Sequence, residues 1–216
     1  KYFGTDGIRG KANEKLTADL ALKVAAYLGH MHQGKKLLIA EDTRRSSRFL
    51  AHALAAGASA YGADVYMLGV APTPACAYLI ESQGFAGGVM ISASHNPFED
   101  NGLKCFDHTG SKVDASFEAA IESYIDGLRE IEVAQASEIG RIIDYSEGLS
   151  AYIQHLEGAF APTLSDYSIV LDCAHGAAVT TARHVFEDLG ARLIVMNETP
   201  DGLNINVDAG STHLDG

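Results

Sequence analysis

The sequence lacks a long apolar segment and is short of positive charge. No apolar run reaches the ~18–20 residues that a membrane-spanning helix needs, and the N-terminal residues 1–4 have no secretory h-region. The chain has 16 Lys and Arg against 28 Asp and Glu, a net charge of −12. Because an acidic chain repels phosphate backbones, we expect no nucleic-acid partner and no membrane. A small phosphorylated ligand stays open, since it needs only a local cationic pocket.

Cysteine is also scarce. The three cysteines, Cys76, Cys105 and Cys173, are widely spaced, and an odd number at such spacing predicts neither a disulfide framework nor a zinc site. We expect buried free thiols in a reducing cytoplasm. Disorder is excluded as the main state, because 47% of the 216 residues are hydrophobic.

Apolar strands alternate with amphipathic helices from the N-terminus to about residue 125. The expected strands are 36–40, 65–68, 87–91 and 103–106, and the expected helices are 17–33, 47–61, 73–82 and 117–125. This alternation predicts an α/β fold with a mostly parallel or mixed sheet flanked by helices. The 22 glycines cluster between the apolar runs, which places function in loops.

A second unit is expected beyond a bridging helix. The bridging helix is expected at 146–160, followed by a strand at 169–172, a helix at 177–189 and a strand at 192–196. Two strands are too few to bury both faces of a sheet. We therefore expect one complete domain at 1–148, and a bridging helix with the beginning of a truncated α/β domain at 149–216.

The segment Ser92–Pro97 carries the densest chemistry. It places two hydroxyls, an imidazole and an amide after an expected strand, where open α/β sheets bind ligands. Its residue types alone fit either a binding loop or a polar turn closed by Asn-Pro. The absence of a G-x-S-x-G elbow makes a serine hydrolase a poor alternative.

Three cations could converge on this loop. Arg9 lies in the glycine-rich segment 3–10, which suits an anion such as phosphate but equally a structural turn. Arg44, just past an expected strand, is either a surface charge or the ion-pair partner of Asp42. Lys104 faces either solvent or a cleft, since side chains alternate along a strand. Together Arg9, Arg44 and Lys104 would form a basic, phosphate-sized pocket in an acidic chain.

Several motifs resemble the α-D-phosphohexomutase family, and most closely its bacterial phosphoglucosamine mutase branch. They are Phe-Gly-Thr-Asp-Gly-Ile-Arg-Gly at 3–10, Asp-Thr-Arg at 42–44, Ser-Ala-Ser-His-Asn-Pro at 92–97, Asn-Gly-Leu-Lys at 101–104, Asn-Ile-Asn at 204–206 and Gly-Ser-Thr-His at 210–213. The resemblance implies a four-domain fold with a central active site. This chain would carry domain 1 and the opening of domain 2.

The resemblance also implies an isomerase that interconverts glucosamine 6-phosphate and glucosamine 1-phosphate. The reaction would pass through a phosphoserine enzyme and a bisphosphate intermediate, and would feed UDP-N-acetylglucosamine and cell-wall synthesis. Ser94 would be the phosphoserine, preferred over Ser92 because it directly precedes the histidine of the motif. The implied catalytic residues are Ser94, His95, Lys104 and Arg9, and the implied substrate- and phosphate-binding residues are Thr5, Arg9, Arg44, Asn96 and Lys104.

The implied cofactors are Mg²⁺, contacting Ser94 through its phosphate, and glucosamine or glucose 1,6-bisphosphate. The family's Asp-x-Asp-x-Asp metal motif does not occur here, and Glu41 stands where the family has glycine. The sugar-recognition and distal phosphate loops are missing too, so we expect this piece alone to be inactive.

The expected partner is a small sugar phosphate, with a homodimer left open, in the cytoplasm. Two alternatives stay open: a phosphomannomutase or phosphoglucomutase of the same family, and a non-catalytic sugar-phosphate-binding module.

Overall fold

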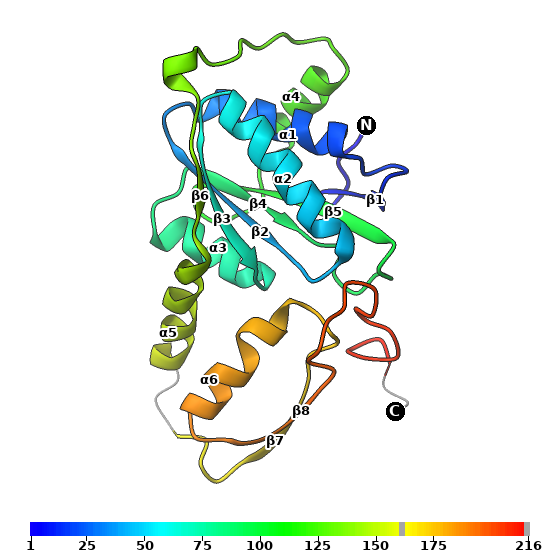
Figure 1. The fold of residues 1–216 in the computed structure, drawn as a ribbon, viewed down its shortest axis with the longest axis vertical. Coiled ribbons are helices and arrows are strands. Elements are labelled where there is room, and N and C mark those ends of the chain that lie inside the picture. Colours follow the sequence, from blue (N-terminus) through cyan, green and yellow to red (C-terminus); the bar gives the residue numbers. More distant parts are fainter. Residues whose placement is uncertain (160–162, 214–216) are drawn as a thin grey trace.

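The computed structural model describes residues 1–159 and 163–213. Its larger unit is a six-stranded sheet in the order β1-β5-β4-β2-β3-β6 (Figure 1). The strands are β1 (Ile8–Lys11), β2 (Lys36–Glu41), β3 (Asp64–Val70), β4 (Gly87–Ile91), β5 (Asp100–Asp107) and β6 (Ile142–Asp144). Strands β2, β3, β4 and β6 run parallel, whereas β5 is antiparallel to both β1 and β4. The expected α/β class with a mixed sheet is confirmed.

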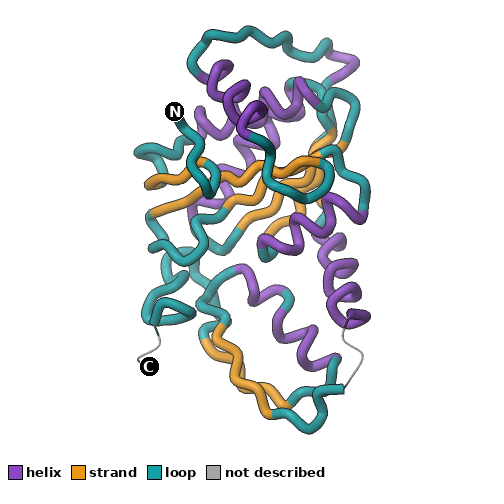
Figure 2. The backbone as a smooth tube through the Cα atoms, turned by 180° about the vertical axis from the view of Figure 1, so that it is seen from behind, coloured by secondary structure: helices purple, strands orange, loops and turns teal. Residues whose placement is uncertain are grey.

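Helices cover both faces of this sheet (Figure 2). One face packs against α1 (Ala18–Met31), α2 (Arg45–Ala60) and α4 (Ala115–Ile125), and the other against α3 (Thr73–Ser82) and α5 (Leu149–Ala159). The four middle residues of β2, 37–40, are all apolar because both faces of the strand are buried there. Leu37 and Ile39 join the first core, whereas Leu38 and Ala40 join the second. A strand buried on both faces has no position for a polar side chain.

Three elements differ from the sequence expectation. Residues 8–11, expected in a loop, form β1 because they pair with β5, with Ile8 opposite Leu103. Residues 142–144 add the short edge strand β6 beside β3. The helix expected at 177–189 is a 3₁₀ turn (Ala177–Thr180) followed by α6 (Ala182–Asp188), because Thr181 between them has a non-helical φ of −129°.

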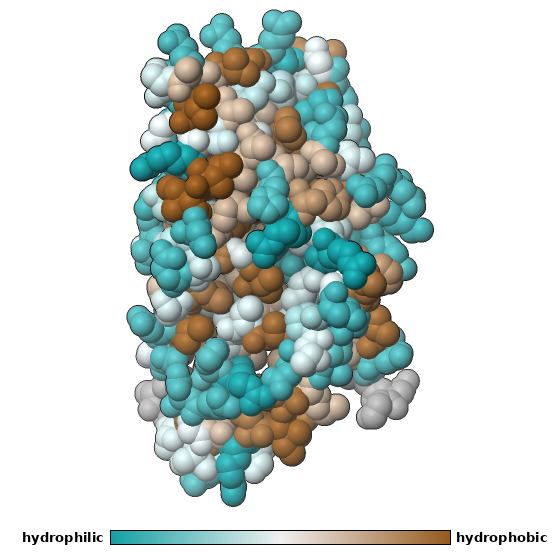
Figure 3. Space-filling model, viewed as in Figure 1, coloured by the Kyte–Doolittle hydropathy of each residue, from teal (hydrophilic) through white to brown (hydrophobic). Residues whose placement is uncertain are grey.

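The second unit is a parallel pair, β7 (Ser168–Asp172) and β8 (Arg192–Met196), with α6 against it. Alternate side chains of both strands are half-buried, whereas Val170, Ile194 and Met196 are exposed. Figure 3 shows hydrophobic surface over the region where Figure 1 draws these strands. One face of this small sheet is therefore open and exposes these three apolar side chains beside polar ones.

Helix α5 joins the two units. It contacts α6 on one side, and on the other its His155 ring stacks on Tyr78 of α3 with centroids 4.1 Å apart. This agrees with a bridging helix, while the division at 1–148 and 149–216 stays a prediction. The parts of the expected elements at 160–162 and 214–216 lie outside the described residues.

The cysteines of the described chain are all buried and unpaired, as expected. Burial raises the pKa of Cys76 and of Cys105 to about 12. No helix in residues 1–159 or 163–213 is long and apolar enough to span a bilayer.

Candidate active site

The candidate site lies at the carboxyl edge of the parallel strands. Strands β2 and β4 are neighbours that end at Glu41 and Ile91, and the Asp42 N–H donates to the Ile91 carbonyl at 2.9 Å. The loops that follow them therefore start side by side. Strand β5 begins at the same edge, because it runs antiparallel to β4. Open α/β sheets bind their ligands at this edge.

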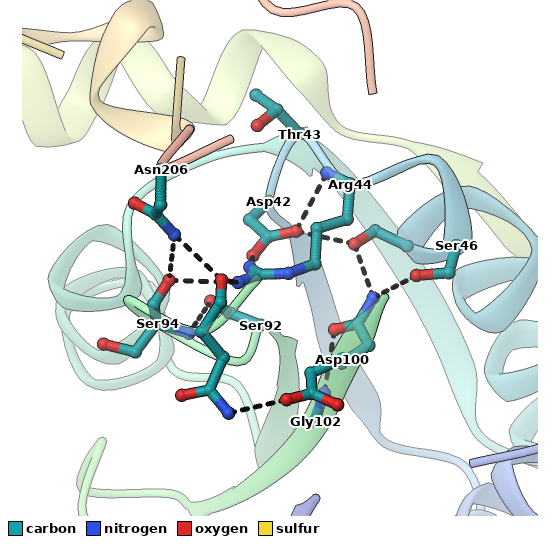
Figure 4. A network of polar contacts seen from close by, with 12 residues as sticks. Asp42, Thr43, Arg44, Ser46, Ser92, Ser94, Asp100, Gly102 and Asn206 are labelled. Atoms are coloured by element: carbon teal, nitrogen blue, oxygen red, sulfur yellow. Dashed lines mark hydrogen bonds and ion pairs between the residues drawn. The ribbon is translucent and has the colours of Figure 1, made fainter. Parts of the chain in front are cut away.

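Ser92 and Ser94 differ in access. Ser92 is only 6% exposed, and its Oγ accepts a hydrogen bond from the Ser94 N–H at 3.0 Å. Ser94 is exposed, and its φ of 59° lies in the left-handed region. Figure 4 shows the Ser94 side chain pointing away from Arg44 and the hydrogen bonds around it. Ser94 thus offers a hydroxyl to a ligand, whereas Ser92 shapes the turn.

Arg44 lies beneath this loop, with 0% of its side chain exposed. Its Nη2 donates to the carbonyl oxygens of Ser94 and Asn96 at 3.1 and 2.7 Å, and its Nη1 pairs with Asp42. Asp42 also accepts from Ser47 Oγ at 2.7 Å. The two terminal nitrogens of this buried guanidinium therefore hold the loop and pair with Asp42, whereas the buried Nε has no hydrogen-bond partner among the described residues. The expected phosphate-binding role of Arg44 stays a prediction.

The network extends into β5. The buried Asn101 donates from Nδ2 to Ser46 Oγ and Ser47 Oγ at 2.9 and 3.0 Å. Asn96 Nδ2 donates to Asp100 Oδ2 at 3.0 Å. The start of α2, the start of β5 and the serine loop are therefore held together by side-chain hydrogen bonds (Figure 4).

Arg9 and Lys104 share one face of the sheet beside this loop. Arg9 pairs with Gly102 across β1 and β5, and Lys104 is two residues further along β5, so alternation puts both side chains on that face. A Cβ at Gly102 would lie 2.7 Å from the Ser92 carbonyl oxygen and 3.1 Å from Arg9 Cγ. The stem of Arg9 therefore passes next to Ser92.

Both cations are half-buried, and neither is fully neutralised. Within the described residues the buried Arg9 Nε has no hydrogen-bond partner, and Arg9 Nη1 is 3.8 Å from the exposed Asp6 carboxylate. Burial, and then repulsion from Arg9, lowers the pKa of Lys104. Two cations held this close together on one face favour an anion between or beside them.

Thr5 and His95 lie at the exposed rim. Thr5 occupies a tight turn in which the Gly4 N–H donates to the Gly7 carbonyl at 2.9 Å, and His95 directly follows Ser94. Neither side chain hydrogen-bonds to another residue in the described part of the chain. Their expected roles stay predictions.

The second unit also reaches the serine loop, which sequence reasoning did not foresee. Asn206 Nδ2 donates to the carbonyl oxygens of Ser94 and Asn96 at 3.0 and 3.1 Å. Thr43 Oγ1 donates to the His175 carbonyl at 2.6 Å. The Asn-Ile-Asn motif was visible in the sequence, but this contact depends on how the two units dock.

Metal ligands are few here. Over residues 1–159 and 163–213 no group of three or more His, Cys, Asp or Glu side chains could hold a metal ion. The hydroxyl of Ser94 becomes a good ligand for Mg²⁺ only once it carries a phosphate. The side chains described therefore do not by themselves form the implied magnesium site.

The fold and the site define a class of domain: a sheet between two layers of helices that brings an exposed serine and two half-buried cations to one edge of the sheet. Residues 1–132 match the family described as Phosphoglucomutase/phosphomannomutase, alpha/beta/alpha domain I, and the chain belongs to this family.

Within the family, the chain is 48% identical over 220 residues to the phosphoglucosamine mutase of Lachnoclostridium phytofermentans, covering 100% of this chain and 49% of that protein. The chain spans about half the length of the curated relatives it matches. The resemblance read from the motifs is confirmed.

Solved structures agree on the fold. A phosphoglucomutase/phosphomannomutase family protein from Burkholderia thailandensis superposes with a TM-score of 0.77 at 26% identity, over 93% of this chain and 44% of that chain. The N-acetylphosphoglucosamine mutase of Aspergillus fumigatus, solved with GlcNAc-6P and magnesium, superposes with a TM-score of 0.51 at 19% identity, over 99% of this chain and 44% of that chain. This second likeness shows the fold alone.

Proposed function

We propose that this chain works as part of a phosphoglucosamine mutase in which phosphorylated Ser94 donates and regains the phosphoryl group. One observation carries the proposal: an exposed Ser94 hydroxyl stands on a left-handed turn that buried Arg44 anchors, beside Arg9 and Lys104. The 48% identity to phosphoglucosamine mutases supports the substrate class. The proposed setting is the cytoplasm, on the route to UDP-N-acetylglucosamine and the cell wall.

In the proposed first step, the 1-hydroxyl of glucosamine 6-phosphate attacks the phosphorus carried by Ser94. The P–Oγ bond breaks, a bond from phosphorus to the sugar oxygen forms, and the hydroxyl proton passes to the Ser94 oxygen through the site. The bisphosphate then turns round. In the second step Ser94 Oγ attacks the phosphorus of the 6-phosphate, the P–O6 bond breaks, and the Ser94 proton passes to the sugar 6-oxygen through the site, which gives glucosamine 1-phosphate and restores the phosphoserine.

Phosphoryl transfer requires positioning and charge neutralisation more than covalent help. A phosphoserine brings about −1.5 to −2 charges at neutral pH, and Arg9 and Lys104 are the cations beside it. The lowered pKa of Lys104 also suits it to share a proton with the transferring oxygen. Asn96 orients the loop, and Thr5 and His95 are proposed to contact phosphate from the rim.

Two small molecules belong to the proposal. Mg²⁺, which is present with the Aspergillus fumigatus enzyme, would contact the phosphate on Ser94, with carboxylate ligands from outside this chain. Bound there, it would supply further charge neutralisation. Glucosamine or glucose 1,6-bisphosphate would phosphorylate Ser94 at the start.

The test uses the complete gene product and the variants Ser94→Ala and Ser92→Ala. Each is treated with glucose 1,6-bisphosphate, mapped by peptide mass spectrometry and assayed for glucosamine 1-phosphate. We expect phosphate on Ser94 and a loss of at least ~10³-fold in Ser94→Ala, which lacks the nucleophile. Phosphate on Ser92, with Ser94→Ala still active, would overturn the assignment.

The same assay separates the alternatives. Glucosamine phosphate should turn over faster than mannose or glucose phosphates, and the reverse order would favour the phosphomannomutase or phosphoglucomutase alternative. The 216-residue chain alone should give no turnover, because an open half-site cannot hold the bisphosphate while it turns. Glucosamine 1-phosphate formed by this chain alone would refute that.

A further inference from the structure

Two side chains from different units hold the same pair of carbonyl oxygens, those of Ser94 and Asn96. Arg44 Nη2 donates to them from the first unit at 3.1 and 2.7 Å. Asn206 Nδ2 donates to them from the second unit at 3.0 and 3.1 Å (Figure 4). Each nitrogen carries two protons and each carbonyl oxygen two lone pairs. The four hydrogen bonds therefore use every donor and acceptor of the group.

We infer that Asn206 is a positioning residue for Ser94, and that it makes the shape of the serine loop depend on the docking of the second unit. This inference rests on the proposed function, because it concerns the same nucleophile. A non-glycine residue at a φ of 59° is strained and persists only where its surroundings hold it. The clamp on the Ser94 carbonyl fixes ψ at Ser94, and with it the path of the loop that presents the hydroxyl.

Two further contacts keep the second unit in place above the site. Thr43 Oγ1 donates to the His175 carbonyl at 2.6 Å. The Arg45 N–H donates to the Gly202 carbonyl at 2.9 Å, at the start of α2, where no side chain caps the helix. Together with Asn206, these bonds tie the second unit to the loops after β2 and β4. A change in the orientation of the second unit relative to the first would therefore alter the position of Ser94.

The backbone at Asn206 limits which variants can test this. Its φ of 61° admits Asn, Asp and Gly, but strains other residues. Asn206→Asp keeps the shape and sets acceptor oxygens against the two carbonyls. Asn206→Gly keeps the backbone and removes the donor without adding charge.

Asn204 supplies the matched control. Asn204 lies two residues before Asn206, but the hydrogen bonds of its side-chain amide stay within residues 199–204. Its Nδ2 donates to the Thr199 carbonyl at 3.0 Å, and its Oδ1 accepts from the Asp201 N–H at 3.0 Å. Asn204→Asp makes the same chemical change without touching the serine loop.

The experiment compares these variants in the complete gene product. It measures the rate of Ser94 phosphorylation by glucose 1,6-bisphosphate, kcat and KM with glucosamine 6-phosphate, and Tm. For Asn206→Asp and Asn206→Gly we expect kcat and phosphorylation to fall about 10- to 100-fold, as misplacement of a reacting group does. KM should stay within about 3-fold, because binding energy common to ground and transition states is untouched. Asn204→Asp should keep wild-type rates with a comparable Tm.

Hydrogen exchange gives a second readout that does not depend on turnover. The Asn96 N–H donates to the Ala93 carbonyl at 3.1 Å inside the loop, and its exchange should accelerate in both Asn206 variants but not in Asn204→Asp. Wild-type phosphorylation rates and unchanged amide exchange at residues 94–96 in Asn206→Gly would overturn the inference. If the wild-type protein takes no phosphate from the bisphosphate, the proposed function is contradicted instead. Amide hydrogen exchange in the variants would then still test the role of Asn206.

Discussion

Gly102 lies so close to Arg9 that a larger residue does not fit without displacing its neighbours. The two are direct partners across β1 and β5, and a Cβ at Gly102 would come within 3.1 Å of Arg9 Cγ and 2.7 Å of the Ser92 carbonyl oxygen. The bare glycine lets the arginine stem pass over the strand toward the serine loop.

Gly102→Ala should therefore disturb both stability and phosphorylation. Overpacking of this kind costs about 1–3 kcal/mol, and the displaced arginine should slow phosphorylation of Ser94. Urea unfolding and phosphate mapping measure the two effects. Gly158→Ala, one residue before the end of α5, is the control: a Cβ there meets nothing within 4 Å, so stability should not fall. Equal behaviour of the two variants would contradict the steric argument.

Arg44→Met should be among the most destabilising single changes in the chain. It leaves the Asp42 carboxylate buried without its cation, and removing one partner of a buried pair costs about 3–5 kcal/mol. The comparison is Arg141→Met, which breaks the pair with Asp64 at a side chain that is 73% exposed, where about 1 kcal/mol or less is expected. Urea denaturation of both variants measures the contrast, and similar losses would show that Arg44 is not a buried anchor.

Glu41 should make the protein less stable as the pH rises. Its side chain is 3% exposed, and burial raises its pKa above the ordinary 4.5 although Arg48, 3.0 Å away, opposes the shift. The folded state then binds the proton more tightly than the unfolded state. Stability is lost as the pH climbs from about 4.5 through the raised pKa.

Glu41→Gln should remove this pH dependence. We would measure the free energy of unfolding of both proteins from pH 4.5 to 8. As the pH rises, the free energy of unfolding of the variant should increase relative to that of the wild type. A difference that stays constant over this range would mean that Glu41 titrates as an ordinary surface glutamate.

Local patterns predicted the elements whose cause is local. The run from β2 to β4 alternates apolar strands with amphipathic helices, and α1 before it begins at a local cap, because Thr17 Oγ1 accepts from the Leu20 N–H at 3.2 Å. Strand β1 escaped prediction because its glycine- and arginine-bearing sequence forms a strand only when paired with β5. Strand β6 is a three-residue edge strand with too few positions for a pattern.

In the candidate site too, features with a local cause could be predicted from the sequence, whereas features that depend on tertiary contacts could not. A candidate site in the loop after β4 could be predicted, because the loops after parallel strands gather at one edge of the sheet. The burial of Arg44 could not be predicted, because the spacing of Asp42 and Arg44 in the sequence fits an exposed ion pair equally well. Neither could Asn206, whose partners are 110 and 112 residues away in the chain.

The left-handed backbone of Ser94 has a consequence for which amino acid can stand there. Threonine carries the same hydroxyl, but its second branch on Cβ makes a φ near 59° a severe outlier. Serine has no such branch and tolerates the turn at moderate cost. The selection of serine over threonine at this position is thus made by the main chain, independently of any difference in the chemistry of the two alcohols.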